Sequence, residues 1–119
     1  MQRYKFNRQS KLKKNKQFQA VYKTGKSYAN KHLVIYILPN KNNESRVGFA
    51  AGKRLGSAPK RNRAKRLLRE AFRLNQHRLK SGFDLILIAR APLIGLDYHS
   101  VNRIFNDIIV RTRLIVEQK

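Results

Sequence analysis

The sequence APKRNRAKRLLREAFRLNQ, residues 58–76, predicts the helix around which the rest of the chain is arranged. Pro59 stands in the first turn, where its missing amide hydrogen costs nothing, and Ser81-Gly82 supplies a break after the last turn. On a helical wheel, the apolar and basic side chains separate onto opposite sides. The apolar side consists of Ala64, Leu67, Leu68, Ala71 and Leu74, with Phe72 at its margin. One side of this helix is therefore expected to pack on a core.

A short helix and three strands are expected before the central helix. Phe18, Val21 and Tyr22 have the i, i+3, i+4 spacing of one helical face, in a segment that starts at Asn15 and ends before Gly25. Runs rich in β-branched and aromatic residues predict strands at 28–29, 33–38 and 46–51.

A strand and a helix are expected after it. Residues 83–89 form an apolar run typical of a buried strand, and residues 92–95 predict a loop. Asp97 is expected to cap a final helix, whose apolar face extends to Ile115 or Val116. The order αβββαβα predicts an α+β sandwich in which three helices pack on one mixed sheet.

The composition limits both the architecture and the partners. The chain has 119 residues with 28 Lys or Arg against 6 Asp or Glu, a formal net charge of +22. This length predicts a single domain over residues 1–119, of which residues 1–10 are expected to be a flexible basic tail. The absence of cysteine excludes a disulfide scaffold, a thiolate zinc site and a cysteine nucleophile. The apolar runs are too short to span a bilayer, so a cytoplasmic protein without a membrane role is expected.

Such an excess of positive charge predicts a polyanionic partner, nucleic acid before an anionic membrane or an acidic protein. Residues 60–73 alone contain seven Lys or Arg and a single acid, Glu70. Like charges three or four positions apart repel, and an ordinary solvated face would mix in acidic partners. Arg and Lys side chains fit phosphate oxygens instead. The polar side of the helix is formed by Asn62, Arg66, Arg69 and Arg73, flanked by Arg61 and Lys65.

Residues 60–70, KRNRAKRLLRE, resemble the RNR motif of the bacterial ribonuclease P protein subunit. Similarity to that family extends over nearly the whole chain. It includes residues 18–22 with Gly25, RVGF at 46–49, KRLG at 53–56 and the strand at 84–90. The resemblance implies a left-handed crossover between parallel strands around the RNR helix, a departure from the usual right-handed connection.

The resemblance also implies contact with a catalytic RNA subunit through the RNR helix and the loop before it. The matching positions are Lys53, Arg54, Arg61, Asn62, Arg63, Lys65, Arg66 and Arg69. Arg63 falls near the apolar margin of the wheel, so the alternative is that its side chain braces the helix against neighbouring loops.

A second implied surface is a cleft between the first helix and the sheet that holds the single-stranded 5′ leader of precursor tRNA. The matching positions are Phe18, Tyr22 and Tyr36. Unpaired bases stack on aromatic rings without strict sequence preference. Since aromatic residues at helical spacing are often core residues, the alternative is that Phe18 and Tyr22 only pack inside the protein.

No catalytic residue and no metal or cofactor site is expected on the polypeptide. His32, His77 and His99 are scattered without metal-ligand spacing, and the glycines at 48, 52 and 56 lack phosphate-loop spacing. The resemblance implies that the RNA subunit, with magnesium, hydrolyses the bond between leader and mature tRNA, and that no small-molecule substrate is involved. The alternatives are a structural RNA-binding protein of the ribosomal type and a DNA-compacting protein.

Overall fold

The structure is a computed structural model that describes residues 15–41 and 44–114. The predicted basic tail at 1–10, and Ile115 and Val116, lie outside the described residues. The chain forms α1 (Asn15–Thr24), β1 (Lys26–Ala29), β2 (Leu33–Pro39), β3 (Arg46–Ala51), α2 (Ala58–Asn75), β4 (Phe83–Ala89) and α3 (Tyr98–Arg111). Short 3₁₀ turns are η2 (Lys53–Leu55), η3 (Gln76–Arg78) and η4 (Ala91–Leu93). The order αβββαβα is confirmed, although η4 occupies part of the predicted loop and β1 starts two residues earlier than expected.

The four strands form one mixed sheet in the order β1-β2-β4-β3. β1 pairs antiparallel with β2, and β2 pairs antiparallel with β4. β3 and β4 are parallel neighbours, and α2 connects them. The predicted mixed sheet is therefore confirmed, and so is a crossover around the basic helix, while the hand of that crossover stays a prediction.

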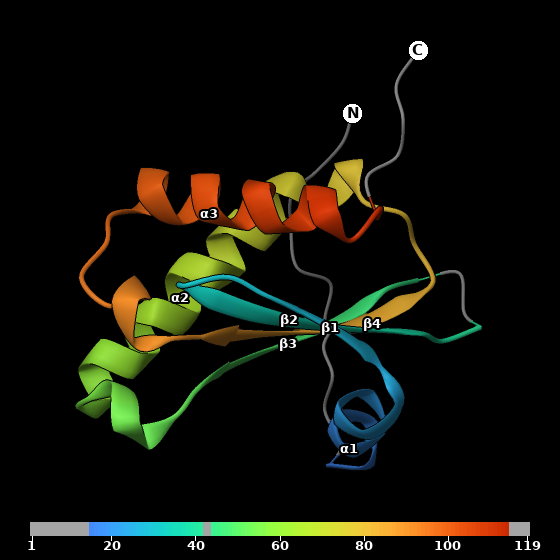
Figure 1. The fold of residues 1–119 in the computed structure, drawn as a ribbon, viewed down its shortest axis with the longest axis horizontal. Helices are drawn as coiled ribbons and strands as arrows, with labels where there is room; N and C mark the ends of the chain where they lie inside the picture. The colour runs from blue at the N-terminus through green and yellow to red at the C-terminus, as the bar shows by residue number, and fades with distance from the viewer. Residues whose placement is uncertain (1–14, 42–43, 115–119) are drawn as a thin grey trace.

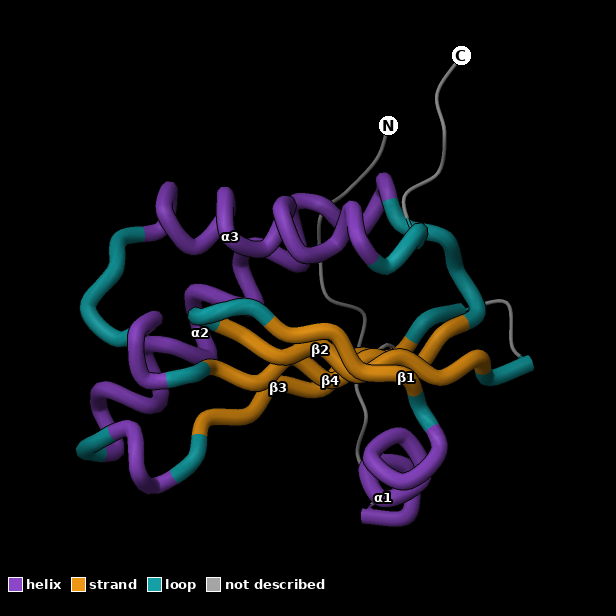
Figure 2. Tube along the Cα trace, in the orientation of Figure 1, coloured by secondary structure: helices purple, strands orange, loops and turns teal. Residues whose placement is uncertain are grey.

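Helices cover both faces of the sheet, with α2 and α3 on one side and α1 on the other (Figure 1). Because side chains alternate along a strand, Leu33, Ile35 and Ile37 of β2 face α2 and α3, while Tyr36 and Leu38 face α1. Figure 2 shows the strands as one twisted layer between the helices. β4 lies inside this layer and is buried on both faces, which explains its nearly continuous apolar sequence.

The residues of α2 that are buried in the structure differ in part from the apolar side that the helical wheel predicted. Phe72 is not marginal but buried, and its ring meets those of Phe49 and Phe105 edge-on, with centroids 6.2 and 6.4 Å away. Leu67 and Leu74 are only half-buried. The reason is that α2 packs against the sheet and α3 at once, so its buried side includes the residues that lie between these two neighbours.

Polar groups fix the positions of the last two helices. Asn75, buried at the end of α2, donates from Nδ2 to the Asn102 Oδ1 of α3 at 2.8 Å. Asp97 Oδ1 accepts a hydrogen bond of 2.8 Å from the Ser100 amide, which confirms the predicted cap of α3. Within the described ranges, no helix is long and apolar enough to cross a membrane.

Candidate nucleic-acid interface

The basic ridge, defined here as the eight positions matched to the RNR motif and its loop, lies on η2 and the first three turns of α2. Most of its side chains are exposed and two are half-buried. The exposed ones are Lys53, Arg54, Asn62, Arg63, Arg66 and Arg69, and the half-buried ones are Arg61 and Lys65. The fold therefore brings all eight predicted RNA-contacting positions to one connected segment at the β3 end of the sheet.

Arg61 ties the preceding loop to the helix. Its Nε donates to the Gly56 carbonyl at 3.2 Å, and the Gly56 amide donates to the Lys53 carbonyl at 3.3 Å. Gly56 has a φ of +124°, which disfavours any side chain, and an added Cβ would lie 3.2 Å from Lys60. This short turn holds Lys53 and Arg54 beside the start of α2.

Arg63 is exposed, but it lines a cavity together with Ala64 and Leu67, at the apolar margin where the wheel placed it. Its Nη1 donates to the Leu96 carbonyl at 3.0 Å, in the loop before α3. The bracing role considered from the sequence is therefore present in the structure. One hydrogen bond leaves the other donors of the guanidinium available, so bracing and phosphate contact are compatible.

Arg69 lies over an aromatic ring. Its guanidinium carbon is 5.4 Å from the centroid of the Phe49 ring, within the range of a cation–π interaction. Phe49 in turn packs edge-on against Phe72 of the core. The position of Arg69 on the ridge is thus linked to the packing between β3 and α2, a contact between distant segments that has no local sequence signal.

Glu70, the one acid in residues 60–73, is paired with Arg73 one turn later. This hydrogen bond, with the nearby positive charge, holds the pKa of the Glu70 carboxyl below its ordinary value. Arg73, which the wheel placed on the basic side, is therefore neutralised. The ridge in front of it has no acidic partner among the described residues.

The three predicted leader-binding residues also come together, on the α1 side of the sheet. The rings of Tyr22 and Tyr36 meet edge-on with centroids 5.1 Å apart and an angle of 82°. Phe18 packs against the small cluster of Val21 and Ile86 beside them. We call Phe18, Tyr22 and Tyr36 the aromatic surface.

The side chains of α1 differ in burial, which distinguishes the residue that packs the helix on the sheet from those of the aromatic surface. Val21 is fully buried, whereas Tyr22 is 41% exposed and Phe18 is half-buried. The alternative that Tyr22 is a core residue is therefore wrong, and Phe18 is both a packing residue and part of the surface. Partial burial raises the pKa of the Tyr22 phenol, and electrostatic repulsion from Tyr36 raises it by a smaller amount. The phenol therefore remains neutral at ordinary pH.

Gly25 fixes α1 against the sheet. A Cβ at this position would lie 2.5 Å from the Val21 carbonyl oxygen and 2.9 Å from that of Ile37, distances that no side chain tolerates. The Gly25 amide donates to the Val21 carbonyl at 2.9 Å and ends the helix. This close approach sets the distance between α1 and β2, and with it the contact between the two tyrosines.

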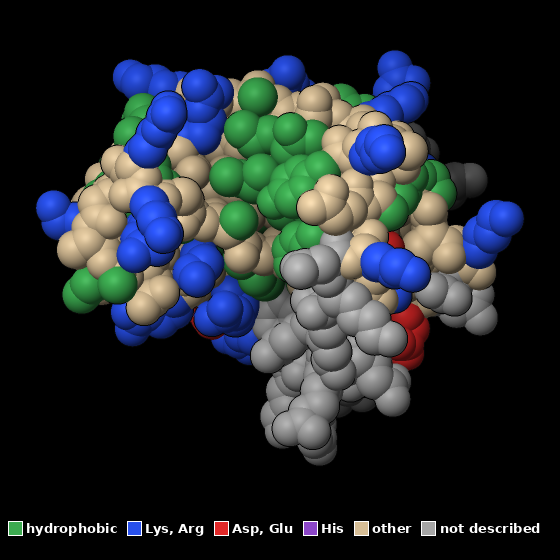
Figure 3. All heavy atoms as spheres, turned by 90° about the horizontal axis from the view of Figure 1, so that it is seen from below, with side chains coloured by type: hydrophobic (Ala, Val, Ile, Leu, Met, Phe, Trp, Pro, Cys, Tyr) green, Lys and Arg blue, Asp and Glu red, His purple; other side chains and the backbone are tan. Residues whose placement is uncertain are grey.

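Hydrophobic side chains gather in the middle of the α1 side of the molecule, and Lys and Arg side chains lie around them (Figure 3). One acidic group on this side, Asp84 of β4, is already engaged. Asp84 accepts two hydrogen bonds from the Arg46 guanidinium, at 2.8 and 2.7 Å, and a third from Asn40 Nδ2 at 2.9 Å. In residues 15–41 and 44–114, no group of three or more His, Asp or Glu side chains is placed to hold a metal ion.

Comparison with known proteins gives one consistent family. The family model "Ribonuclease P" matches residues 6–113. The ribonuclease P protein component of Natranaerobius thermophilus is 47% identical over 104 residues, which cover 87% of this chain and 90% of the relative. That of Clostridioides difficile is 44% identical over 112 residues, which cover 93% and 98%.

Solved structures agree with the sequence comparison. The RNase P protein of Staphylococcus aureus superposes with a TM-score of 0.83 at 31% identity, covering 90% of this chain and 98% of that one. The RNase P protein of Thermotoga maritima superposes with a TM-score of 0.78 at 29% identity, covering 91% and 98%. Neither a ribosomal nor a DNA-compacting protein is needed to explain the basic ridge, and the chain belongs to the ribonuclease P protein component family.

Proposed function

We propose that this chain uses two separate surfaces, the basic ridge for the catalytic RNA of ribonuclease P and the aromatic surface for the 5′ leader of precursor tRNA. By its family, the chain is part of the ribonucleoprotein that processes the 5′ ends of tRNA. Beyond this family role, we assign each of the two surfaces to one RNA. The proposal places the chain with these RNAs in the cytoplasm.

The observation that carries the proposal is the different chemistry of the two faces. The ridge consists of Arg and Lys side chains and Asn62, and none of its cations forms an ion pair with a described acid. Such a surface suits the phosphate backbone of a folded RNA. Tyr22 and Tyr36, on the opposite face of the sheet, present aromatic rings that are partly open to solvent. Rings of this kind stack on unpaired bases, a contribution of about 1–3 kcal/mol per base.

For the ridge we propose direct RNA contact by Lys53, Arg54, Asn62, Arg66 and Arg69. Arg61, Arg63 and Lys65 complete the proposed set. Arg61 and Arg63 each hold one backbone carbonyl, at Gly56 and Leu96, so they also shape the surface that the other side chains present.

The division of labour follows from what the residues offer. Hydrolysis is assigned to the RNA subunit with magnesium, because the described acids are engaged in ion pairs, a helix cap or isolated positions and form no acid–base pair on this chain. The protein lowers the repulsion between two polyanions and favours precursor over mature tRNA by binding the leader.

Reconstitution tests this proposal. The protein with its cognate RNA should cleave precursor tRNA at a magnesium concentration at which the RNA alone is inactive, and the protein alone should not cleave. Tyr36→Ala should weaken binding of precursor and leave binding of mature tRNA unchanged, whereas Arg66→Ala should weaken assembly with the RNA subunit. If both variants affect the same step, the assignment of two surfaces is wrong.

A further inference from the structure

A cavity of about 300 Å³ lies at the end of the sheet where β1 and β2 meet the last turn of α3. Its apolar wall includes Ile37 and two half-buried aromatic rings, Tyr28 and Phe83. Figure 1 shows that this end of the molecule, with β1 and the end of α3, lies away from η2 and the start of α2. The cavity is therefore separate from the basic ridge.

Three cationic side chains from three segments border the cavity: Lys26 of β1, Lys80 before β4, and Arg113 after α3. All three are exposed, and no described acidic residue lines the cavity or forms an ion pair with any of them. In contrast, Arg46 and Arg73 are both paired with acids. Among the described residues, the rim therefore carries positive charge without an acidic partner around an apolar wall.

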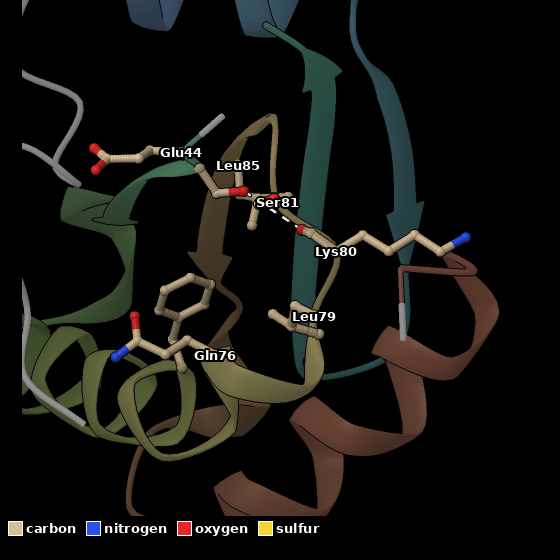
Figure 4. Close-up of a pocket in the computed structure, with 8 residues that line it drawn as sticks. Glu44, Gln76, Leu79, Lys80, Ser81 and Leu85 are labelled. Atoms are coloured by element: carbon tan, nitrogen blue, oxygen red, sulfur yellow. Dashed lines mark hydrogen bonds between the residues drawn. The ribbon is translucent and has the colours of Figure 1, made fainter. Parts of the chain in front are cut away.

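Lys80 illustrates how the fold directs this charge. Its carbonyl accepts a weak hydrogen bond of 3.5 Å from Ser45 Oγ beside a different cavity, of about 250 Å³, near Leu85. The Lys80 side chain extends away from that cavity, toward the end of α3 (Figure 4). There the Lys80 amide donates to the Leu114 carbonyl at 2.6 Å, which holds the segment of Arg113 next to it.

Arg113 has an unusual backbone conformation. Its φ is +62°, in the left-handed region, at the position after a helix where glycine is the common residue. Thr112 and Arg113 donate backbone hydrogen bonds to the carbonyls of Ile109 and Val110, so the turn itself has no need of an arginine side chain. A strained residue whose side chain borders a cavity is an indication of function.

We propose that this cavity binds one unpaired nucleotide of the precursor leader, with its base against Tyr28 and Phe83 and its phosphate beside Lys26, Lys80 and Arg113. The inference rests on the proposed function and extends it beyond the aromatic surface. Aromatic rings beside free cations are the chemistry that binds single-stranded nucleic acid. The cavity volume of about 300 Å³ lies at the lower end of the range of roughly 300–1,000 Å³ for small-molecule sites.

The position of the cavity favours the leader over the RNA subunit. Thr24, which borders it, is the last residue of the helix that carries Phe18 and Tyr22, and Lys26 follows two residues later. Lys26 and Ser27 are exposed on β1, the edge strand next to β2. A strand that leaves the aromatic surface therefore reaches the cavity by crossing this edge from one face of the sheet to the other.

The test compares Arg113→Gly with Lys41→Gly in the holoenzyme. Lys41 is an exposed cation with a φ of +64° outside the cavity, so the two variants lose the same charge and relieve the same backbone conformation. The affinity of each holoenzyme is measured for precursors whose leaders are shortened one nucleotide at a time.

Arg113→Gly and Lys80→Ala should each lose about twofold to fivefold in affinity for long leaders, as for an exposed ion pair. Neither should lose affinity for the shortest leaders, and Lys41→Gly should match the parent at every length.

A second readout identifies the contact directly. A photoreactive base placed along the leader should crosslink to the peptide that contains Phe83 at a position farther from the cleavage site than any base that crosslinks to Tyr36. Equal losses for long and short leaders, a loss in affinity for the RNA subunit alone, or no loss at all would each overturn the proposal. If Tyr36→Ala also leaves the dependence on leader length unchanged, the proposed function itself fails.

Discussion

The rings of Tyr22 and Tyr36 meet edge-on across the junction between α1 and β2, with centroids 5.1 Å apart. This contact joins the helix and the sheet and leaves part of each ring open. Replacing either tyrosine with Ala should therefore reduce affinity for precursor tRNA by about 1–3 kcal/mol per lost stacking contact. Equilibrium binding of precursor and mature tRNA to the reconstituted holoenzyme measures the effect.

Tyr22→Phe is the matched control for this prediction. It keeps the ring and removes only the hydroxyl, so affinity for precursor should stay close to that of the parent. If Tyr22→Phe loses as much as Tyr22→Ala, the hydroxyl and not the ring is responsible, and stacking is the wrong explanation.

Arg66 and Arg69 should contribute to the salt dependence of RNA binding. Each phosphate that the protein neutralises releases counterions, so losing one contact lowers the slope of log affinity against log salt by about 0.7–0.9. Arg66→Ala and Arg69→Ala should each show this reduction in titrations with the RNA subunit, while Lys41→Ala should not. An unchanged slope would remove the tested arginine from the phosphate contacts.

Arg69→Lys separates charge from geometry. Lysine keeps the positive charge but lacks the planar fork and stacks less well over Phe49, where the Arg69 carbon is 5.4 Å from the ring centroid. The salt slope should therefore be retained while affinity falls. Equal losses of slope for Lys and Ala at this position would contradict the role of the charge.

Glu70→Gln should strengthen RNA binding, because it releases Arg73 from its ion pair and adds one net positive charge. The salt slope should become steeper by up to about 0.7–0.9 if the released Arg73 reaches a phosphate. Weaker binding would show instead that the pair positions the ridge.

The same pair makes a prediction about acid stability. The hydrogen bond from Arg73 lowers the pKa of Glu70 in the folded protein from an ordinary value of 4.5. The unfolded chain therefore takes up the proton first as pH falls. The contribution of the pair is present above pH 4.5 and is lost as pH falls through the lowered pKa. Unfolding of the parent should lose a small, screened contribution in this range that Glu70→Gln lacks.

The order of elements could be predicted because it depends on local pattern. The cap at Asp97 and the alternation of β2 are readable from neighbouring residues. The buried position of Phe72 could not be predicted, because it depends on where α3 and β3 lie around α2. A helical wheel describes one helix, and the direction of its neighbours is set by the rest of the fold.

The candidate site was predictable to the same degree. The charge pattern of α2 and the resemblance indicated the basic ridge, but not that Arg63 would hold the Leu96 carbonyl or that Arg69 would lie over Phe49. The cavity near Arg113 could not be foreseen either, because its three cations are far apart in the sequence. Contacts between distant segments have no local signal in one sequence.

The Arg46–Asp84 pair should be important for stability. It joins the parallel strands β3 and β4 through two hydrogen bonds, of 2.8 and 2.7 Å, and the Asp84 side chain is only 6% exposed. Asp84→Ala leaves the Arg46 cation without its acceptor and removes one of the acceptors of Asn40 Nδ2, which also donates to the Glu44 carbonyl. Breaking a buried pair in this way costs about 3–5 kcal/mol. Because Arg46 is 25% exposed, the loss in free energy of unfolding, measured in urea, is expected at the lower end of this range.

The double variant Arg46→Met, Asp84→Asn should recover part of that loss, since it removes the unpaired cation and keeps an acceptor for Asn40. A double variant no more stable than Asp84→Ala would show that packing, and not the uncompensated charge, accounts for the loss.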